Sequence, residues 1–408
     1  MNHNMESPTP AGDKIRLTCS NCQGSLLVPA SAAGKKTRCP HCEQVIEVKM
    51  PSAELALGSE LDEPSSFPAS ESHLAVNPLD SVVPGNAASE MYHRVTEQVG
   101  KMFVGQSGLL MGTMVAVFSG GHILIESVPG LGKTLFVRTL GKALGCQFGR
   151  IQFTADLMPS DITGSPIFNV KEQEFVFRRG PVFTQLLLCD EINRAPAKTH
   201  AALLEIMQER NVTVDGNTHE LQAPFVVLAT QNPIESEGTY NLPEAQLDRF
   251  MFKLTMDYPD LKEESEIVMR HSTLKDLDQR LLDEVKTVTT PEEVVAIGLQ
   301  SESVRVDPLL VNYITRLVRA TRTWPSFHGG ASPRAAIGLV QGARMLAAFC
   351  GRDFAVPDDV VQLVKPILRH RVRLTAEAEV EGQLVDQLID EVIRSVEVPR
   401  LNVPVTAN

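Results

Sequence analysis

The segment HILIESVPGLGKT, residues 122–134, carries residues of the types and spacing that bind phosphate. Gly132, Lys133 and Thr134 fit the end of the pattern G-x-x-x-x-G-K-[ST], in which the lysine reaches the outer phosphates and the hydroxyl holds Mg2+. The first position is Ser127 instead of glycine. Serine fits there at little cost if its φ is negative, and with strain of roughly 1–3 kcal/mol if φ is positive. The sequence therefore predicts a nucleotide site with one departure from the usual loop.

The expected phosphate cradle follows Ser127 and uses backbone N–H groups at the start of a helix. Its residues are Val128, Pro129, Gly130, Leu131 and Gly132.

A second segment, FTQLLLCDEINR, supplies carboxylates. Four apolar residues, 186–189, predict a buried strand that delivers Asp190 and Glu191 at its carboxyl end. We expect Asp190 to hold Mg2+ through water and Glu191 to orient and polarise the attacking water as general base. Capping of the next helix is the alternative for Glu191 alone, and the phosphate loop upstream argues against it.

Three further polar residues are candidates for the same site. The strand FVVLATQNP ends at Asn232, where it could contact the terminal phosphate or the water. Arg249 follows in LPEAQLDRF, and Arg334 lies at the start of a helix in GGASPRA. Taken singly, either arginine could equally be a surface charge in a salt bridge. Their order along the chain favours the functional interpretation.

The ordered series HILIESVPGLGKT, RIQFTADLMPSDITG, FVFRRGPVF, LLLCDEINRAPAKTHAALLEIMQE, FVVLATQNPIESEGTYNLPEAQLDRF and GASPRA resembles the MoxR family of AAA+ ATPases over roughly residues 90 to 400. The resemblance implies that Lys133 and Thr134 form the Walker A motif. It likewise implies that Asp190 and Glu191 form Walker B and that Asn232 is sensor 1. ATP and Mg2+ are the implied cofactors.

The resemblance also implies how subunits share the site. Arg249 matches the arginine finger that a neighbouring subunit contributes, and Arg334 matches sensor 2 on the lid. A site completed between subunits implies a homo-oligomeric ring, most often a hexamer. The implied client is a protein, such as one with a von Willebrand A domain, undergoing maturation or metal insertion. The family usually has glycine at position 127, so Ser127 bears directly on turnover.

The expected fold class is α/β: a P-loop AAA+ core with a parallel sheet over residues 90–260, followed by an all-α lid over residues 261–404. Two segments, 165–177 and 212–221, have β-prone runs around polar turns and predict hairpins. They resemble the helix-2 insert and the presensor hairpin of this AAA+ branch, which project from the ring face and pore. Surface hairpins without a contact role are the alternative.

Apolar residues at three- and four-residue steps predict the lid helices LLVNYITRLVRATR, AAIGLVQGARMLAAFC and PDDVVQLVKPILRHRV. Caps are expected at Asp307, at Ser332 and at Pro357 or Asp358. A lone histidine in the last of these helices, His370, is expected to be structural rather than a ligand.

The N-terminal segment, residues 14–50, has the spacing of a four-thiolate zinc site, two C-x2-C pairs separated by sixteen residues. The four expected zinc ligands are Cys19, Cys22, Cys39 and Cys42. Short apolar runs would carry them as strands of a zinc ribbon. Because four thiolates leave no position for water, we expect a structural rather than a catalytic Zn2+. Residues 51–89 are rich in Pro, Ser, Ala and Glu and predict an acidic flexible linker.

Composition bounds the remaining possibilities. The 408 residues are 43% hydrophobic and carry a net charge of −12, which is typical of a globular protein and argues against nucleic acid as a partner. The N-terminus has no apolar signal region, and no long uninterrupted apolar segment predicts membrane insertion, so a soluble, cytoplasmic protein is expected. Three isolated cysteines, Cys146, Cys189 and Cys350, are expected to fill the core.

Three functions compete. The favoured one is an ATP-driven remodeller of a protein client, because all the phosphate-contacting and carboxylate positions except the first glycine are retained. The second is a nucleotide-gated assembly scaffold with little turnover, for which Ser127 would be the sign. The third, a nucleic-acid motor, has only the zinc module and the phosphate loop in its favour.

Overall fold

The computed structural model describes most of the chain, in two compact units that comprise residues 1–71 and 72–408. Each unit is treated by itself. The residues described are 14–18, 25–29, 35–40, 42, 44–47, 85–232, 242–272 and 276–400.

The first unit contains two antiparallel strand pairs. β1 (Lys14–Thr18) pairs with β2 (Ser25–Pro29), and β3 (Lys36–Arg38) pairs with β4 (Val45–Glu47). Cys39 and Cys42 lie in the turn between β3 and β4, where the Cys39 N–H donates to the Gln44 carbonyl at 2.9 Å.

The predicted zinc site can be assessed only in part. Cys19 and Cys22 lie outside the described residues. Among the residues that are described, no three His, Cys, Asp or Glu side chains gather as a metal site. The zinc site therefore stays a prediction.

A five-stranded parallel sheet forms the centre of the second unit, in the order β13-β5-β12-β9-β6. This confirms the predicted α/β fold class. The strands are β5 (Ile123–Ser127), β6 (Phe148–Gln152), β9 (Leu186–Asp190), β12 (Val226–Gln231) and β13 (Phe252–Met256).

The central strands are buried on both faces, which explains their continuous apolar runs. On β9, Leu186 and Leu188 belong to one apolar core, while Leu187 and Cys189 belong to another. Helices cover both faces. Those that precede the lid are α1 (Ala87–Gly100), α2 (Ser107–Phe118), α3 (Lys133–Leu144), α4 (Pro159–Thr163), the short 3-10 helix η2 (Ile192–Arg194), α5 (Ala197–Glu209) and α6 (Glu244–Leu247).

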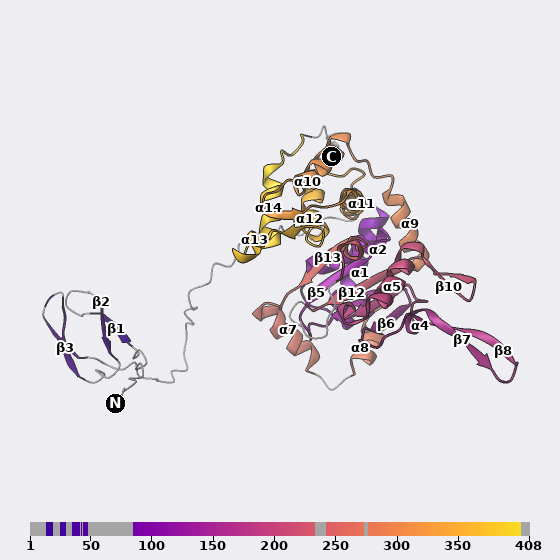
Figure 1. Ribbon diagram of the computed structural model, residues 1–408, viewed down its shortest axis with the longest axis horizontal. Coiled ribbons are helices and arrows are strands. Elements are labelled where there is room, and N and C mark those ends of the chain that lie inside the picture. Colours follow the sequence, from indigo (N-terminus) through magenta and orange to yellow (C-terminus); the bar gives the residue numbers. More distant parts are fainter. Residues whose placement is uncertain are drawn as a thin grey trace, which may run out of the picture. The chain divides into compact units, whose positions relative to one another are not determined.

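Both predicted hairpins are confirmed. β7 (Gly164–Asn169) pairs with β8 (Glu174–Arg179), and this hairpin extends away from the sheet and its helices (Figure 1). β10 (Asn211–Val214) pairs with β11 (Asn217–Glu220) around a turn at residues 215 and 216, both with positive φ. A contact role for either hairpin stays a prediction.

The C-terminal part is a helical lid, as predicted, whose helices α10, α11, α12 and α14 gather on one side of the sheet (Figure 1). Its helices are α7 (Leu261–His271), α8 (Leu277–Glu284), α9 (Pro291–Ser301), α10 (Pro308–Ala320), α11 (Pro333–Phe349), α12 (Pro357–Leu368), α13 (Ala376–Val380) and α14 (Val385–Ser395). A short antiparallel pair, β14 (Phe327–Gly329) and β15 (Arg373–Leu374), was not predicted.

The helix caps are largely as expected. Asp307 and Ser332 cap α10 and α11 with their side chains. At α12 the cap is Val356, because Pro357 already has helical geometry and occupies the first turn.

The isolated cysteines and His370 are structural, as predicted. Cys146, Cys189 and Cys350 are buried, and burial raises the pKa of each thiol, to about 12 for Cys146. His370 is buried and its Nε2 donates to the Phe250 carbonyl at 2.9 Å. None of the helices described is long and apolar enough to span a membrane.

Candidate nucleotide site

Parallel strands place the predicted phosphate-binding and acidic residues at one edge of the sheet. β12 lies between β5 and β9, with Gln231 of β12 opposite Glu126 of β5. The next residues along these two strands are therefore Asn232, which is buried, and Ser127. Asp190 ends β9 at the same edge. The carboxyl ends of parallel strands are the usual position for a ligand in such a sheet.

Ser127 fits the phosphate loop without strain. It is the last residue of β5, its backbone is extended, and its φ is not positive. Its Oγ accepts a hydrogen bond from Lys133 Nζ at 2.7 Å, and the same ammonium donates to the Val128 carbonyl at 2.9 Å. The serine hydroxyl thus contacts the lysine that is expected to reach the phosphates.

The loop that follows is shaped for an anion. Gly130 and Gly132 have φ of 86° and 84°, a left-handed conformation that favours glycine. α3 begins at Lys133, directly after the loop, and none of the described side chains caps it. Its first backbone N–H groups are therefore available to phosphate oxygens, and the helix dipole favours negative charge there. Pro129 has no N–H and contributes only to the shape of the loop.

Lys133 has the electrostatic environment of a phosphate-binding lysine. Burial lowers its pKa, and the negative charges of Asp190 and Glu191 oppose that shift. Thr134, the second residue of α3, lies beside it at the start of the helix. The residues present thus fit ATP with Mg2+: a lysine, a hydroxyl, two carboxylates and a turn of unoccupied N–H groups.

Asp190 is buried and its carboxylate has two partners. Arg150 Nε on β6 donates to Oδ2 at 2.7 Å, and Thr230 Oγ1 on β12 donates to Oδ1 at 3.2 Å. Thr230 Oγ1 also accepts the backbone N–H of Glu191 at 2.9 Å. One threonine hydroxyl therefore connects both acidic residues to the neighbouring strand.

Glu191 has an uncommon backbone conformation, with φ of 55°. Left-handed geometry at a residue other than glycine is frequent at functional sites, where the surroundings hold it in place. The carboxylate accepts from Gln152 Nε2 at 2.8 Å and forms an ion pair with Arg194 Nε at 3.0 Å. These contacts hold the expected general base at the edge of the sheet.

The contacts of the two carboxylates come from residues that the sequence analysis missed. Arg150 and Gln152 lie on β6, whose register places Gln152 opposite Asp190. In the sequence, these are two polar residues two positions apart in RIQF, so both point to the same face of a strand. Their contacts with the carboxylates could not be predicted without knowing that β6 pairs with β9.

An apolar cavity of about 340 Å3 adjoins the phosphate loop. Its lining includes Phe103, Leu131, Tyr258 and Ile267, together with the loop glycines. A flat apolar ring such as a purine suits this lining. The lining ends at His271, so none of the described helices from α9 onward borders the cavity.

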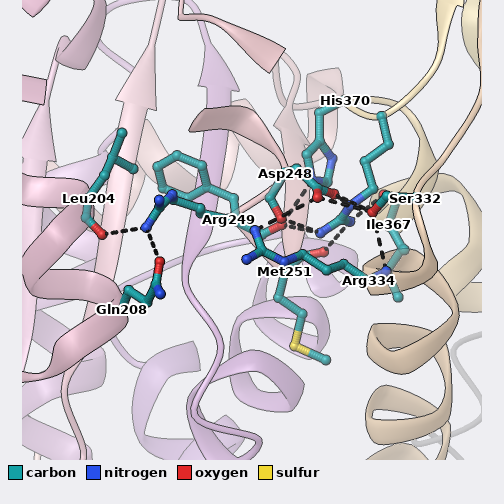
Figure 2. Close-up of polar contacts among 11 residues, drawn as sticks. Leu204, Gln208, Asp248, Arg249, Met251, Ser332, Arg334, Ile367 and His370 are labelled. Atoms are coloured by element: carbon teal, nitrogen blue, oxygen red, sulfur yellow. Dashed lines mark hydrogen bonds and ion pairs between the residues drawn. The ribbon is translucent and has the colours of Figure 1, made fainter. Parts of the chain in front are cut away.

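The two predicted arginines lie close to each other (Figure 2). Arg249 Nη1 donates to the Leu204 carbonyl at 3.0 Å and to Gln208 Oε1 at 2.5 Å, both on α5. Arg334 Nη1 lies 3.8 Å from the carboxylate of Asp248. Both arginines line a small cavity of about 140 Å3, and neither lines the cavity beside the phosphate loop.

A parallel sheet with a phosphate loop after one strand and paired carboxylates after another defines a P-loop ATPase. Comparison with known proteins agrees. Residues 122–252 match the profile of the ATPase family associated with various cellular activities (AAA), and residues 319–392 match the AAA lid domain. The crystal structure of a candidate ATPase from Cytophaga hutchinsonii superposes with a TM-score of 0.71 at 41% identity, covering 77% of this chain and 96% of that one.

Among curated relatives, Chaperone MoxR1 of Mycobacterium tuberculosis is 41% identical in an alignment that covers 80% of this chain and 89% of the relative. Protein MoxR of Methylorubrum extorquens is 31% identical over 75% of this chain and 94% of its own length. The uncharacterized protein YeaC of Bacillus subtilis is 42% identical over 75% of this chain and 94% of its own length. The chain therefore belongs to the MoxR family of AAA+ ATPases.

Proposed function

We propose that this ATPase assembles into a ring, most simply a hexamer, and uses ATP hydrolysis between subunits to remodel a protein client. The observation that carries the proposal is that the charged residues predicted for the site fall into two groups. Lys133 and the carboxylates lie at the phosphate loop, whereas Arg249 and Arg334 lie together elsewhere. A cation that neutralises charge on a transferring phosphoryl group must lie close to that group. Arg249 can therefore act on the nucleotide of a neighbouring subunit, although it lies away from the phosphate loop of its own.

Each residue at the phosphate loop then has a defined role. Lys133 and the N–H groups of α3 bind the phosphates, and Thr134 and Asp190 hold Mg2+, which neutralises phosphate charge. Glu191 accepts the proton of the attacking water, and Asn232 orients that water or the terminal phosphate.

Arg249 of a neighbouring subunit stabilises the charge that develops on the phosphoryl oxygens. Arg334 of that same neighbouring subunit, at the start of α11 on its lid, approaches the same nucleotide as sensor 2 and transmits hydrolysis to the lid.

The client is a protein, and a relative named a chaperone supports that class. The β7–β8 hairpin presents exposed apolar side chains, including Phe168 and Phe175, whose rings lie 5.2 Å apart. A surface of this kind is suited to protein contact. We propose a partner with a von Willebrand A domain and a role in maturation, including metal insertion.

The N-terminal unit is proposed to be a zinc ribbon that docks partners. Cys39 and Cys42, three positions apart in the β3–β4 turn, suit one half of a tetrahedral thiolate site. We expect one Zn2+ per chain in the purified protein, and loss of that metal in Cys39→Ser. Metal analysis of both proteins tests this assignment, which an unchanged zinc content would refute.

The alternative is a nucleotide-gated scaffold with little turnover. Its main support was Ser127, and the extended backbone at that position weakens it.

Mixing of two inactive proteins tests the shared site. Lys133→Ala removes the phosphate lysine, and Arg249→Ala removes the cation expected to act on a neighbour. In a mixed assembly, a Lys133→Ala subunit supplies Arg249 to the intact phosphate loop of an Arg249→Ala subunit. We expect ATP hydrolysis to return in the mixture. Absence of any recovery, with mixed assemblies shown by pull-down of differently tagged chains, would contradict the proposal.

A further inference from the structure

The loop that carries Arg249 is held by one buried side chain of the lid. Arg371 follows α12, and its side chain is only 4% exposed. Its Nε donates to Asp248 Oδ1 at 2.8 Å, although the two residues are 123 positions apart in the chain. Asp248 directly precedes Arg249.

All five N–H groups of Arg371 have acceptors. Besides Asp248 Oδ1, Nη2 donates to the carbonyls of Asp248 and Phe250 at 3.1 and 2.6 Å. Nη1 donates to the carbonyls of Met251 and Ile367 at 3.1 and 2.6 Å. The guanidinium is thus bonded to backbone on both sides of Arg249, and to the last turn of α12, the helix that precedes it.

The carboxylate of Asp248 also contacts the lid, through two residues at the start of α11. Ser332 Oγ donates to its two oxygens at 3.0 and 3.2 Å, and Arg334 Nη1 lies 3.8 Å away. Ser332 also caps α11 by accepting the Arg334 N–H at 3.2 Å. In Figure 2, the Asp248 side chain points toward Ser332 and Arg334, while that of Arg249 points toward Leu204 and Gln208.

We propose that Asp248 and Arg371 are positioning residues that hold Arg249 and Arg334 as one rigid unit for the nucleotide of a neighbouring subunit. This inference rests on the proposed sharing of the site. A rigid unit explains why so many donors meet at one short loop: a guanidinium is effective on a phosphoryl group only within a narrow geometry. It also connects the lid to the arginine finger, so lid movement would displace both arginines together.

The test uses Arg371→Lys, which keeps the positive charge but has three donors where arginine has five. We expect turnover to fall on the order of 100-fold, as for a small misplacement of a catalytic group. ATP affinity should stay unchanged, because Arg371 does not line the cavity at the phosphate loop. Arg373→Lys is the matched control with wild-type turnover, since Arg373 is exposed and its ion-pair partner, Glu244, is exposed as well.

Mixing then separates positioning from a general loss of structure. Arg371→Lys mixed with Lys133→Ala should recover activity, because the second protein supplies an intact Arg249 to the first. Arg371→Lys mixed with Arg249→Ala should stay inactive, because neither protein presents that arginine correctly. Recovery in the second mixture, recovery in neither, or wild-type turnover of Arg371→Lys alone would overturn the inference.

Two controls complete the design. The mixture of Lys133→Ala with Arg249→Ala must recover activity; if it does not, the shared site itself fails rather than the role of Arg371. Asp248→Asn, which keeps the shape of the side chain and removes its charge, replaces Arg371→Lys if that variant does not fold. Asp248→Asn should recover activity when mixed with Lys133→Ala and stay inactive when mixed with Arg249→Ala. The opposite result would equally overturn the inference.

Discussion

At the scale of single residues, the site is a set of charged groups whose positions are fixed by neighbours. The hydroxyl of Thr230 contacts both Asp190 and the backbone of Glu191. Gln152 and Arg194 hold the Glu191 carboxylate. This arrangement leaves Glu191, the proposed general base, little freedom to move, and restricted motion is how a catalytic group gains effectiveness from its surroundings.

Glu191→Gln should abolish turnover while preserving ATP binding. The amide has nearly the same shape but cannot accept the proton of water, and loss of a general base costs on the order of 100- to 10,000-fold. The measurement is ATP hydrolysis beside equilibrium ATP binding. Glu205→Gln, at an exposed position of α5, is the control and should behave as wild type. Undiminished hydrolysis in Glu191→Gln would assign the base elsewhere.

Ser127→Gly should not raise turnover and should lower it by roughly 100-fold at most, because the change removes one hydrogen bond to Lys133, worth up to about 3 kcal/mol, and relieves no strain. Ser127→Ala is the matched control, since it removes the hydroxyl without adding backbone freedom. Steady-state kinetics of the three proteins provide the measurement. A large gain of turnover in Ser127→Gly would instead favour the scaffold interpretation.

At the scale of elements, the parallel sheet brings together residues that are far apart in sequence. The phosphate loop and the carboxylate strand could be predicted, because each is a contiguous motif with its own apolar strand. The hairpins and the lid helices could be predicted for the same reason, since local periodicity and turn residues specify them.

The contacts between residues of different elements could not be predicted, because they depend on which elements lie next to each other in the fold. Arg150 and Gln152 matter only because β6 pairs with β9. Arg371 matters only because α12 brings it to Asp248. The grouping of Arg334 with Arg249 likewise depends on how the lid packs on the core.

One buried histidine should make the free energy of unfolding depend on pH. His122 precedes β5; its Nδ1 accepts the Val227 N–H at 3.0 Å and its Nε2 donates to the Met207 carbonyl at 3.0 Å. Burial lowers its pKa from 6.5 to about 4. As pH falls, the unfolded chain therefore protonates this imidazole at a higher pH than the folded chain does. The contribution of neutral His122 to the free energy of unfolding is complete above pH 6.5 and is lost as pH falls from 6.5 to about 4, a change of roughly 3 kcal/mol.

The free energy of unfolding, measured by denaturant titration across that pH range, should therefore fall less steeply in His122→Gln than in wild type. Some slope will remain, since burial also lowers the pKa of His200 and His370. The control is His328→Gln, at an exposed position, which should retain the wild-type slope. Equal slopes in all three proteins would contradict a buried, neutral His122.

At the scale of the whole molecule, the nucleotide machinery belongs to one compact unit. Every proposed catalytic, positioning and nucleotide-contacting residue lies between positions 103 and 371, within the unit formed by residues 72–408. The N-terminal residues are assigned to a separate unit. This division is consistent with a partner-docking role for the N-terminal unit and a motor role for the rest.

A chain without residues 1–71 should therefore keep its ATP hydrolysis. The reason is that its site residues and both apolar cores lie in the second unit. Turnover at saturating ATP, together with a cooperative thermal unfolding transition, provides the measurement. A folded truncated chain that no longer hydrolyses ATP would show that the N-terminal unit takes part in the site or in assembly.

In the proposed assembly, the ATP site of one subunit is completed by a neighbouring subunit. The most direct test is the rate of Mg-ATP hydrolysis per chain, measured over a wide range of protein concentration at saturating ATP. We expect a rate per chain that rises steeply with concentration and reaches a plateau as assembly completes. A rate per chain that stays constant across the range while the protein is shown to be monomeric would contradict it.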